Sequence, residues 1–297
     1  MGVSSVTLRL PATSANLGPG FDTLGLALEL FSEVEISLGE AEDAAGPAER
    51  SVVLAAQAAC RFVERECPPL HVRFLSRVPH SRGLGHSAIC RAAGMLAAEA
   101  LCDVYLQDHE LLALGTELEG HADNIAACLF GGLQVVARSG LKVYRAGLPV
   151  PADYSAVLFI PEMEMSTEAG RRLLPRELSR EDAVFNISRT ALLVAALVEG
   201  FSDLINEATQ DRLHQPARTQ LFPEMPLLFT AAREAGALGV FLSGGGSTVL
   251  ALAKDKEDEI AEAMASAARA NSLAGRTLVT RLSNSGAAVV DQAPANA

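Results

Sequence analysis

The chain has 297 residues, of which 49% are hydrophobic and 20% charged, so it carries enough apolar side chain to build a buried core. Its 24 Lys and Arg residues stand against 36 Asp and Glu residues, which leaves a formal net charge of −12. Because nucleic-acid phosphates require a basic surface, we expect no nucleic-acid partner, although a small site lined by backbone N–H groups can still hold a nucleotide. The length predicts one large domain or two small ones.

No apolar stretch is long enough to cross a membrane, and the first residues lack a basic segment ahead of an apolar core. The sequence therefore predicts a cytoplasmic protein without membrane contact. The cysteines are odd in number and form no C-x-x-C pair, so neither a disulfide framework nor a Cys-rich zinc site is expected. We expect reduced and mostly buried thiols at Cys60, Cys67, Cys90, Cys102 and Cys128.

Hydrophobic periodicity predicts the elements of the first half of the chain. The longest helix begins near Ser87 and covers about four turns of apolar residues at three- and four-residue spacing. Gly120 is the expected end of the next helix. The expected strands are 6–10, 34–38, 70–74, 132–137, 141–145 and 155–160, and the expected helices are about 51–65, 87–101 and 108–118, with a polar loop at 39–50.

A Gly/Pro-containing segment at 147–151 marks a boundary between two lobes, residues 1–147 and 148–297. Gly200 and Gly236 are the expected ends of two helices in the second lobe. Its expected helices are near 166–174, 181–199, 203–213, 224–235 and 255–270, and its expected strands are near 238–242, 248–253 and 276–282. Residues 287–297 are rich in Ala and Pro, and we expect them to fray. Strands and helices that do not strictly alternate indicate an α+β fold.

The first glycine-rich segment, residues 11–22, reads Pro-Ala-Thr-Ser-Ala-Asn-Leu-Gly-Pro-Gly-Phe-Asp and directly follows a predicted strand. Its glycines indicate a tight turn, which places the short polar side chains of Asn16 and Asp22 close together. An ordinary strand-to-helix turn, with Asp22 as a cap, explains the same residues.

The second glycine-rich segment, residues 79–88, joins a strand to the long helix. Gly83 and Gly85 allow close backbone approach, and the helix start offers free N–H groups and a positive dipole end, which suit a phosphate. Ser87 supplies a hydroxyl that is within reach of a magnesium ion. The segment lacks the Gly-Lys-Ser/Thr of the Walker pattern, and ordinary helix capping is the alternative.

Two further segments carry polar or glycine-rich patterns. Residues 243–248, Ser-Gly-Gly-Gly-Ser-Thr, allow close approach to a ligand or a neighbouring element, or form a hairpin turn. Glu119, His121 and Asp123 lie together at a helix end. A solvated helix terminus explains them, and their spacing is not that of a helical i, i+4 metal site.

Taken in order, these segments resemble the GHMP small-molecule kinases, and within them the homoserine kinase branch. Residues 11–22 look like the first family motif, and Arg82-Gly-Leu-Gly looks like the second, phosphate-binding motif. Residues 119–124 and the Phe-Gly-Gly at 130–132 continue the match. Residues 167–175, 214–218 and 243–248 resemble three further segments, so the resemblance spans residues 6–282.

The resemblance implies an N-terminal lobe like the second domain of ribosomal protein S5, a ferredoxin-like C-terminal lobe, and an active site between them. It also implies a reaction, in which MgATP phosphorylates the side-chain hydroxyl of L-homoserine to give O-phospho-L-homoserine for threonine biosynthesis. A homodimer is an expectation at the family level only.

Roles for individual residues follow from the same resemblance. The phosphate-binding segment comprises Arg82, Gly83, Leu84, Gly85, His86, Ser87, Ala88 and Gly245, with Arg82 expected in packing or an ion pair. Ser87 and Glu119 match magnesium positions, and their hard oxygens suit that ion. The residues that match homoserine-contacting positions are Asn16, Asp22, His121, Thr167, Arg171 and Arg218.

Among these residues, Asp22 is the expected partner of the substrate ammonium. Arg171 and Arg218 would clamp the carboxylate with planar, bidentate donors. Thr167 and Asn16 are the expected catalytic positions near the reacting centre. No residue stands out as a general base, so the hydroxyl is expected to lose its proton toward the phosphate.

The nucleotide side departs from the family pattern. His86 stands where a Ser is usual, and its ring would crowd the phosphate or, if protonated, attract it and raise activity toward acid pH. No Asn for adenine contact precedes the helix at 51–65, and Ala127 and Ser247 replace usual Pro residues. Two alternatives therefore stay open: a catalytically impaired homoserine-binding or regulatory relative, and a GHMP kinase with a different alcohol acceptor.

Overall fold

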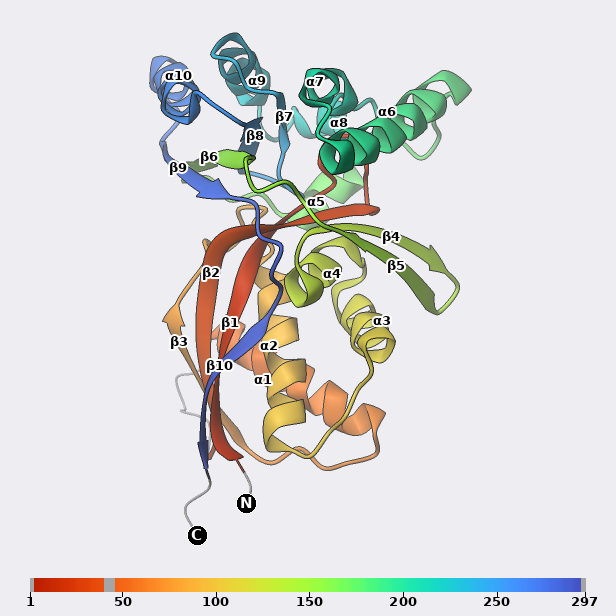
Figure 1. Cartoon of the computed structure of the whole chain (residues 1–297), viewed down its shortest axis with the longest axis vertical. Helices are drawn as coiled ribbons and strands as arrows, with labels where there is room; N and C mark the ends of the chain where they lie inside the picture. Colours follow the sequence, from red (N-terminus) through yellow and green to blue (C-terminus); the bar gives the residue numbers. More distant parts are fainter. Residues whose placement is uncertain (1–2, 40–45, 295–297) are drawn as a thin grey trace.

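Two lobes stack along the long axis of the molecule in the computed structural model, which describes residues 3–39 and 46–294 (Figure 1). The N-terminal lobe holds a six-stranded antiparallel sheet in the order β10-β1-β2-β4-β5, with β3 also paired to β2. Its strands are β1 (Val3–Ala15), β2 (Leu24–Leu38), β3 (Leu70–Ser76), β4 (Leu133–Ser139), β5 (Lys142–Leu148) and β10 (Ala288–Pro294). Among the described residues, no helix is both long enough and apolar enough to cross a lipid bilayer.

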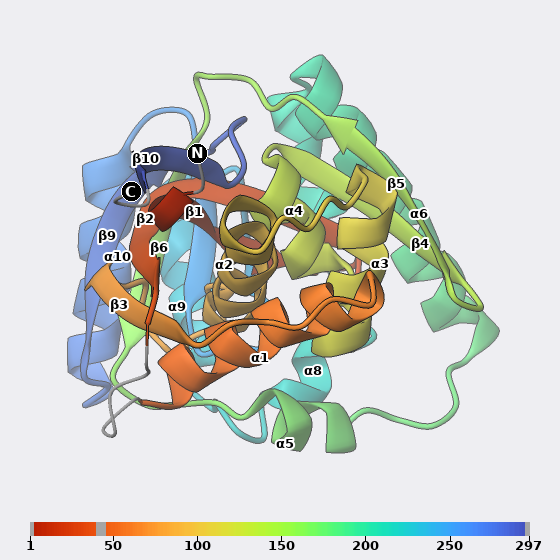
Figure 2. The same ribbon diagram turned by 90° about the horizontal axis from the view of Figure 1, so that it is seen from below.

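Four helices cover one face of this sheet: α1 (Pro47–Phe62), α2 (His86–Leu101), α3 (Asp108–Glu119) and α4 (Asp123–Phe130). Figure 2 shows α2 at the centre of this layer, with α1 alongside it. The two helices approach closely because Gly94 has no side chain, and a Cβ added there would overlap the backbone oxygen of Val52. The same position lies against the Ala55 side chain and the Ala56 backbone of α1.

The C-terminal lobe has a four-stranded antiparallel sheet in the order β7-β8-β6-β9. Its strands are β6 (Ser155–Pro161), β7 (Gly239–Leu242), β8 (Val249–Ala253) and β9 (Gly275–Arg281). The helical segments are α5 (Thr167–Arg172), α6 (Arg180–Glu199), η1 (Ser202–Leu204), α7 (Ile205–Ala208), α8 (Gln215–Arg218), α9 (Met225–Glu234) and α10 (Glu257–Ala270). Residues 249–253 are all buried, which explains their continuous apolar run.

The expected strands and most of the expected helices are present, with shifted ends. Gly120 and Gly200 end their helices in the left-handed conformation, as predicted, at φ values of 88° and 77°. The loop expected at 39–50 is shorter, because Pro47 begins α1, and residues 40–45 lie outside the described part of the chain.

Three elements differ from the sequence expectation. The helix expected at 203–213 ends at Ala208, and the Asp211 carboxylate then accepts N–H bonds from residues 213–215 and so caps a new turn. The fraying expected at 287–297 is wrong for 288–294, which form β10 against β1, and residues 295–297 lie outside the description. Helix α4 was not expected, since its Ala-rich stretch of eight residues is short.

Strand β10 pairs with the first sheet, so the last strand of the chain lies in the N-terminal lobe. The division into 1–147 and 148–297 stays a prediction, with the amendment that β10 belongs to the sheet of the N-terminal lobe. The chain therefore crosses between the lobes twice, once after β5 and again after β9 (Figure 1).

The α1–α2 contact yields a test of the fold. In Gly94→Ala, helix propensity alone would stabilise the protein by about 1 kcal/mol, but separating packed helices costs about 1–3 kcal/mol. We expect a net loss of about 1 kcal/mol in the free energy of unfolding, measured from urea denaturation. The control is Ser266→Ala, which changes an exposed position within α10 and should be neutral. A stabilised Gly94→Ala variant would contradict the close contact.

Candidate active site

A cavity of about 520 Å³ lies between the two lobes. Its walls come from the turn after β1, the segment before α2, the junction of α3 and α4, the start of α5, and the 243–248 loop. The predicted site residues that line it are Asn16, Asp22, Arg82, Gly83, Leu84, Gly85, His86, Ser87, Glu119, His121, Thr167, Arg171, Arg218 and Gly245. Ala88 does not line the cavity, because its side chain is buried in the core of the N-terminal lobe.

The three glycine-rich segments pack directly on one another at one wall of this cavity. The Ser243 hydroxyl donates to the Gly83 carbonyl at 2.7 Å, and the Gly244 N–H donates to the Ala15 carbonyl at 3.0 Å. A Cβ at Gly83 would overlap the Ser243 carbonyl oxygen, and one at Gly85 would overlap the Thr13 hydroxyl. Segments that are far apart in the sequence thus form one rigid backbone surface.

The phosphate-binding segment ends at the N-terminus of α2. Gly85 is the N-cap residue at a φ of 72°, and the helix has no acidic residue in its first turn. The first N–H groups of a helix have no partner within it, so those of the first turn, Ala88 included, are available to an anion. Ser87 is exposed beside them.

The Arg82 side chain bonds to the segment that follows β6. Its guanidinium donates from Nε to the Pro161 carbonyl at 2.8 Å and from Nη2 to the Glu162 carbonyl at 2.5 Å. It also pairs with Glu164 at 3.3 Å. Arg82 therefore ties the phosphate-binding segment to the chain that follows β6, as the packing or ion-pair expectation stated.

His86 is buried between aromatic neighbours, stacked on Phe74 at 5.9 Å and in edge contact with His80 at 5.1 Å. Burial, followed by the charges of His80 and Arg77, lowers the pKa of His86 to about 4. The imidazole is therefore neutral at neutral pH, and the expectation that a protonated His86 attracts phosphate there is wrong. Its Nδ1 has no hydrogen-bond partner among the described residues.

Ser87 and Glu119 lie together, as a magnesium site requires. The Ser87 hydroxyl donates to Glu119 Oε2 at 3.0 Å, and both oxygens line the cavity. A hydroxyl and a carboxylate are the hard ligands that Mg²⁺ prefers, with phosphate oxygens and water completing its shell. The donor set therefore fits this ion.

Arg91 also contacts this pair, which sequence reasoning missed. Its Nη1 lies 2.9 Å from Glu119 Oε2 and also donates to the Ser87 hydroxyl, while its Nε donates to the Leu118 carbonyl at 2.8 Å. A cation bound between Ser87 and Glu119 would have to share the carboxylate with this guanidinium. The i, i+4 spacing of Ser87 and Arg91 on α2 was the available signal.

Asp22 and Arg171 form a bidentate ion pair across the cavity. The guanidinium donates to the two carboxylate oxygens at 2.9 and 2.5 Å, and this hydrogen bond is the main cause that raises the pKa of Arg171. The Phe21 ring lies beneath the guanidinium, 5.1 Å from its central carbon. The resemblance assigned Asp22 to the substrate ammonium and Arg171 to the substrate carboxylate. In the structure, these two side chains bind each other.

Arg218 is almost fully buried and has no ion pair with any described carboxylate. Its Nη1 lies 2.7 Å from His214 Nδ1 and donates to the Gly244 carbonyl at 3.0 Å, while its Nε has no partner among the described residues. Burial, and then the nearby charge of Arg171, lowers the pKa of Arg218 to about 10. A buried cation without a counterion is unfavourable, so an anion that entered the cavity would find a partner here.

Asn16 holds the turn that presents Asp22. Its side-chain amide donates to the Gly244 carbonyl at 2.9 Å, and its oxygen accepts the Asp22 N–H at 3.0 Å. Both residues have positive φ, 69° for Asn16 and 55° for Asp22, which Asn and Asp tolerate better than most residues do. These contacts describe a positioning residue rather than a free catalytic group.

His121 lies against two carboxylates. Its Nδ1 is 2.7 Å from Asp123 Oδ1, and its Nε2 is 3.9 Å from Glu119 Oε1. Burial opposes protonation, but the hydrogen bond to Asp123 and the charges of Asp123, Glu119 and Asp22 together raise the pKa of His121 above its ordinary value. His121 therefore retains a proton more readily than a free histidine.

Thr167 is exposed at the start of α5, next to Gly245. Several further residues line the cavity, although the sequence assigned them no site role. His80, Ser81, Asp123, Asn124, Gly244 and Gly246 lie within the segments that the sequence singled out, whereas Glu164, Met165 and Ser166 lie outside them. Asn124 accepts the Thr13 hydroxyl at 2.7 Å.

Comparison with known proteins places these features in a family. Residues 51–132 match the GHMP kinases N terminal domain, and residues 193–270 match GHMP kinases C terminal. The chain is 42% identical over 270 residues to the homoserine kinase of Moorella thermoacetica, covering 88% of this chain and 91% of that protein. It is 39% identical to the homoserine kinase of Synechococcus sp., covering 95% and 96%. The crystal structure of homoserine kinase from Cytophaga hutchinsonii matches with a TM-score of 0.87 at 30% identity, covering 97% and 98% of the two chains.

The chain therefore belongs to the GHMP kinase family, whose members are ATP-dependent small-molecule kinases with Mg²⁺ as their usual ion. The homoserine kinases are the branch of this family that its relatives represent. The two-lobed α+β fold that the sequence predicted is confirmed.

His121 gives the site a testable pH dependence. Because its pKa is raised in the folded state, the stability that it contributes is fully present below the unfolded-state value of about 6.5. That contribution is lost as the pH rises through the folded-state pKa. We expect the difference in unfolding free energy between wild type and His121→Gln to shrink as the pH rises above about 6.5. Urea denaturation across this range measures it, with His109→Gln, an exposed α3 position, as the control. A constant difference would disprove the raised pKa.

Arg91 gives a second test, directed at the magnesium pair. Arg91→Met keeps an unbranched apolar stem and removes the charge that shares Glu119. We expect Mg²⁺ to bind about fivefold more tightly in the presence of ADP, as loss of roughly 1 kcal/mol of competition implies. Calorimetric titration measures this, with Arg73→Met, whose partner Glu35 lies on β2, as the control. Weaker Mg²⁺ binding would show instead that Arg91 orients the ligands.

Proposed function

We propose that this protein is a homoserine kinase, which transfers the γ-phosphoryl group of ATP to the side-chain hydroxyl of L-homoserine and yields O-phospho-L-homoserine and ADP. The observation that carries the proposal is the Asp22–Arg171 pair beside Arg218, in the same cavity as the phosphate-binding segment. The names of the curated relatives agree with it. In this role it would be a cytoplasmic enzyme of threonine biosynthesis. A homodimer stays a prediction.

The charges at the substrate end match a zwitterionic amino acid. In the structure, the Asp22 carboxylate and the Arg171 guanidinium neutralise each other. An α-amino acid can insert between them, with its ammonium on Asp22 and its carboxylate on Arg171 and the uncompensated Arg218. Each charged group then has a partner of opposite charge, with one substrate carboxylate shared by the two guanidiniums, and the buried Arg218 gains the counterion that it lacks. A neutral sugar or an alcohol without these groups would leave the pair unsatisfied.

The nucleotide end supplies positioning and positive potential. The N–H groups at the start of α2 would receive phosphate oxygens, and the contact with the 243–248 loop keeps that backbone in place. Ser87 and Glu119 would hold Mg²⁺, which neutralises phosphate charge during transfer. The neutral ring of His86 adds bulk beside this path but no charge.

Neither Asp22 nor His121, the two titratable acid–base groups expected at the substrate, is free to act as a general base for the acceptor hydroxyl. Asp22 is engaged by Arg171. Against the effect of burial, the hydrogen bond to Asp123 raises the pKa of His121 and favours the protonated imidazole, which cannot accept a further proton. We therefore propose that the hydroxyl proton passes to the phosphoryl group, while Thr167 orients the hydroxyl and Asn16 positions Asp22. Catalysis then comes from orientation and charge stabilisation.

The test is ADP release by the purified protein with MgATP and L-homoserine. We expect turnover with L-homoserine and none above background with γ-hydroxybutyrate, which lacks the ammonium, or aminopropanol, which lacks the carboxylate. In Arg218→Lys, loss of the planar donor should raise KM for homoserine about tenfold or more, with KM for ATP unchanged.

Three controls keep this experiment decisive. Arg276→Lys changes an exposed arginine of β9 and should leave both constants unchanged. Thermal unfolding checks that Arg218→Lys is folded. His86→Ser, run in parallel, reports whether the imidazole limits nucleotide use. Homoserine binding by calorimetry without turnover would refute the kinase and indicate a binding or regulatory relative, and turnover with another alcohol would indicate a different acceptor.

A further inference from the structure

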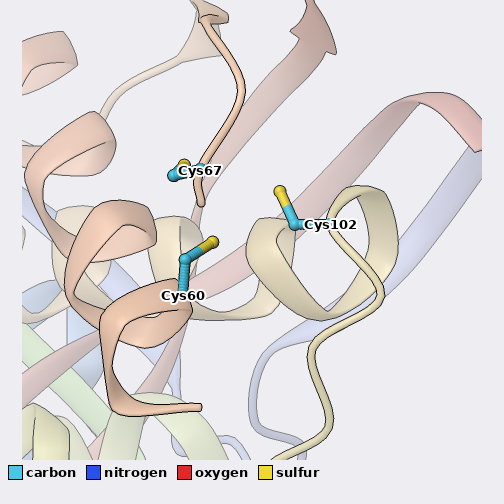
Figure 3. Close-up of side chains that lie close together, drawn as sticks. All are labelled: Cys60, Cys67 and Cys102. Carbon is cyan, nitrogen blue, oxygen red and sulfur yellow. The ribbon is translucent and has the colours of Figure 1, made fainter. Parts of the chain in front are cut away.

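Three cysteines converge at the far end of the N-terminal lobe, away from the cavity (Figure 3). Cys60 lies in the last turn of α1, Cys67 in the segment after it, and Cys102 directly after α2. Their Sγ atoms all lie within 4.8 Å of one another. Cys60 is buried, and the other two are partly exposed, so the group is reachable from solvent on one side.

The separation of the sulfur atoms fits a shared metal ion. Bonds of 2.3 Å to a tetrahedral Zn²⁺ place neighbouring sulfurs about 3.8 Å apart. The three Sγ atoms therefore need to contract by about 1 Å at most, which side-chain rotation can supply. Thiolates are soft ligands that select Zn²⁺, Cd²⁺ or Cu⁺ over Mg²⁺ and Ca²⁺, so the magnesium ion of the kinase site would not compete here.

Without a metal, the surroundings of Cys67 and Cys102 favour the protonated thiol. Burial, together with the neighbouring Cys60, raises the pKa of Cys67 to about 11, and burial with both neighbouring thiols raises the pKa of Cys102 to about 12. Cys67 keeps its proton in a contact of 3.6 Å with the Pro68 carbonyl. A bound divalent cation reverses this balance, because it displaces thiol protons outright.

We propose that Cys60, Cys67 and Cys102 form a binding site for one thiophilic divalent cation, such as Zn²⁺, with a fourth position open to water. Binding forms three metal–sulfur bonds and releases three thiol protons to solvent, with no change of oxidation state. The nearby Arg61, whose charge already favours the thiolate of Cys67, would partly offset the net charge of −1 on a Zn²⁺ tristhiolate.

The cysteine cluster lies far from the phosphate-binding segment, so a bound metal would affect the stability of the lobe and not the reaction. Helix α2 has 16 residues and carries Ser87 in its first turn, so the cysteine cluster lies about 24 Å from the phosphate-binding segment. It joins the C-terminal ends of α1 and α2 to the segment that leads into β3. A metal there would stabilise the α1–α2 layer without touching the reacting groups.

The test is metal binding by the reduced full-length chain, with Cd²⁺ as the spectroscopic probe. We expect one Cd²⁺ per chain, with sulfur-to-metal charge-transfer absorption, and tighter binding as the pH rises. A ligand bound only to the folded state at 100 times its Kd favours folding about 100-fold, so we expect Zn²⁺ to raise Tm by about 5 °C or more. Kinase activity should not depend on this occupancy.

Two partly exposed positions provide variants that keep the fold. Cys67→Ser and Cys102→Ser should each weaken Cd²⁺ binding at least tenfold and abolish the Zn²⁺-dependent rise in Tm. Cys128→Ala, at a buried thiol outside the cluster, should retain both signals. Binding that these Ser variants leave unchanged, or a wild-type chain that binds no Cd²⁺ and instead forms a disulfide under mild oxidant, would overturn the proposal.

Discussion

Backbone atoms of segments 82–85 and 243–248 lie in direct contact, which is possible because Gly83 carries no Cβ. The Ser243 hydroxyl and the Thr248 N–H bond to the carbonyls of Gly83 and Arg82, and the Gly244 N–H bonds to the end of β1. These bonds join the two lobes at the cavity, so the start of α2 and Arg218 keep a fixed separation. Phosphoryl transfer depends on such fixed separations, because most of its acceleration comes from orientation and charge.

Opposite charges are paired within this cavity before any ligand enters. Asp22 is matched by Arg171, Glu119 by Arg91, and Asp123 by His121. Asp22 and Glu119, the two carboxylates that the sequence assigned to ligands, thus each have a guanidinium partner that a ligand would replace or share. Arg218 differs from these guanidiniums, because no described carboxylate pairs with it and its hydrogen-bond partners are His214 and the Gly244 carbonyl. This pairing means that the half-buried charges do not lie without a counterion in a region of low dielectric constant.

Helix α2 connects two chemically different ends of the N-terminal lobe. Its N-terminus faces the cavity with unpaired N–H groups and a hard hydroxyl ligand, whereas its C-terminus ends beside three soft sulfur atoms (Figure 3). Hard and soft ligands select different cations, so the two ends need not interfere with each other. Helix α1 packs closely on α2 at Gly94, so both ends of α2 belong to one rigid helical layer.

The sequence by itself determined the local elements and the identity of the site residues. Periodicity predicted most strands and helices, Gly120 and Gly200 marked helix ends, and the ordered glycine motifs identified the residues that line the cavity. These features depend on residues that are neighbours in the sequence, so the sequence alone predicts them.

Only the tertiary structure decided which charged side chains meet. Arg91 contacts the Ser87–Glu119 pair, and Arg171 binds Asp22. The tertiary structure also decided that His86 is neutral, that β10 returns to the first sheet, and that three dispersed cysteines converge. Desolvation and long-range pairing arise from residues far apart in the chain, and no local pattern encodes them.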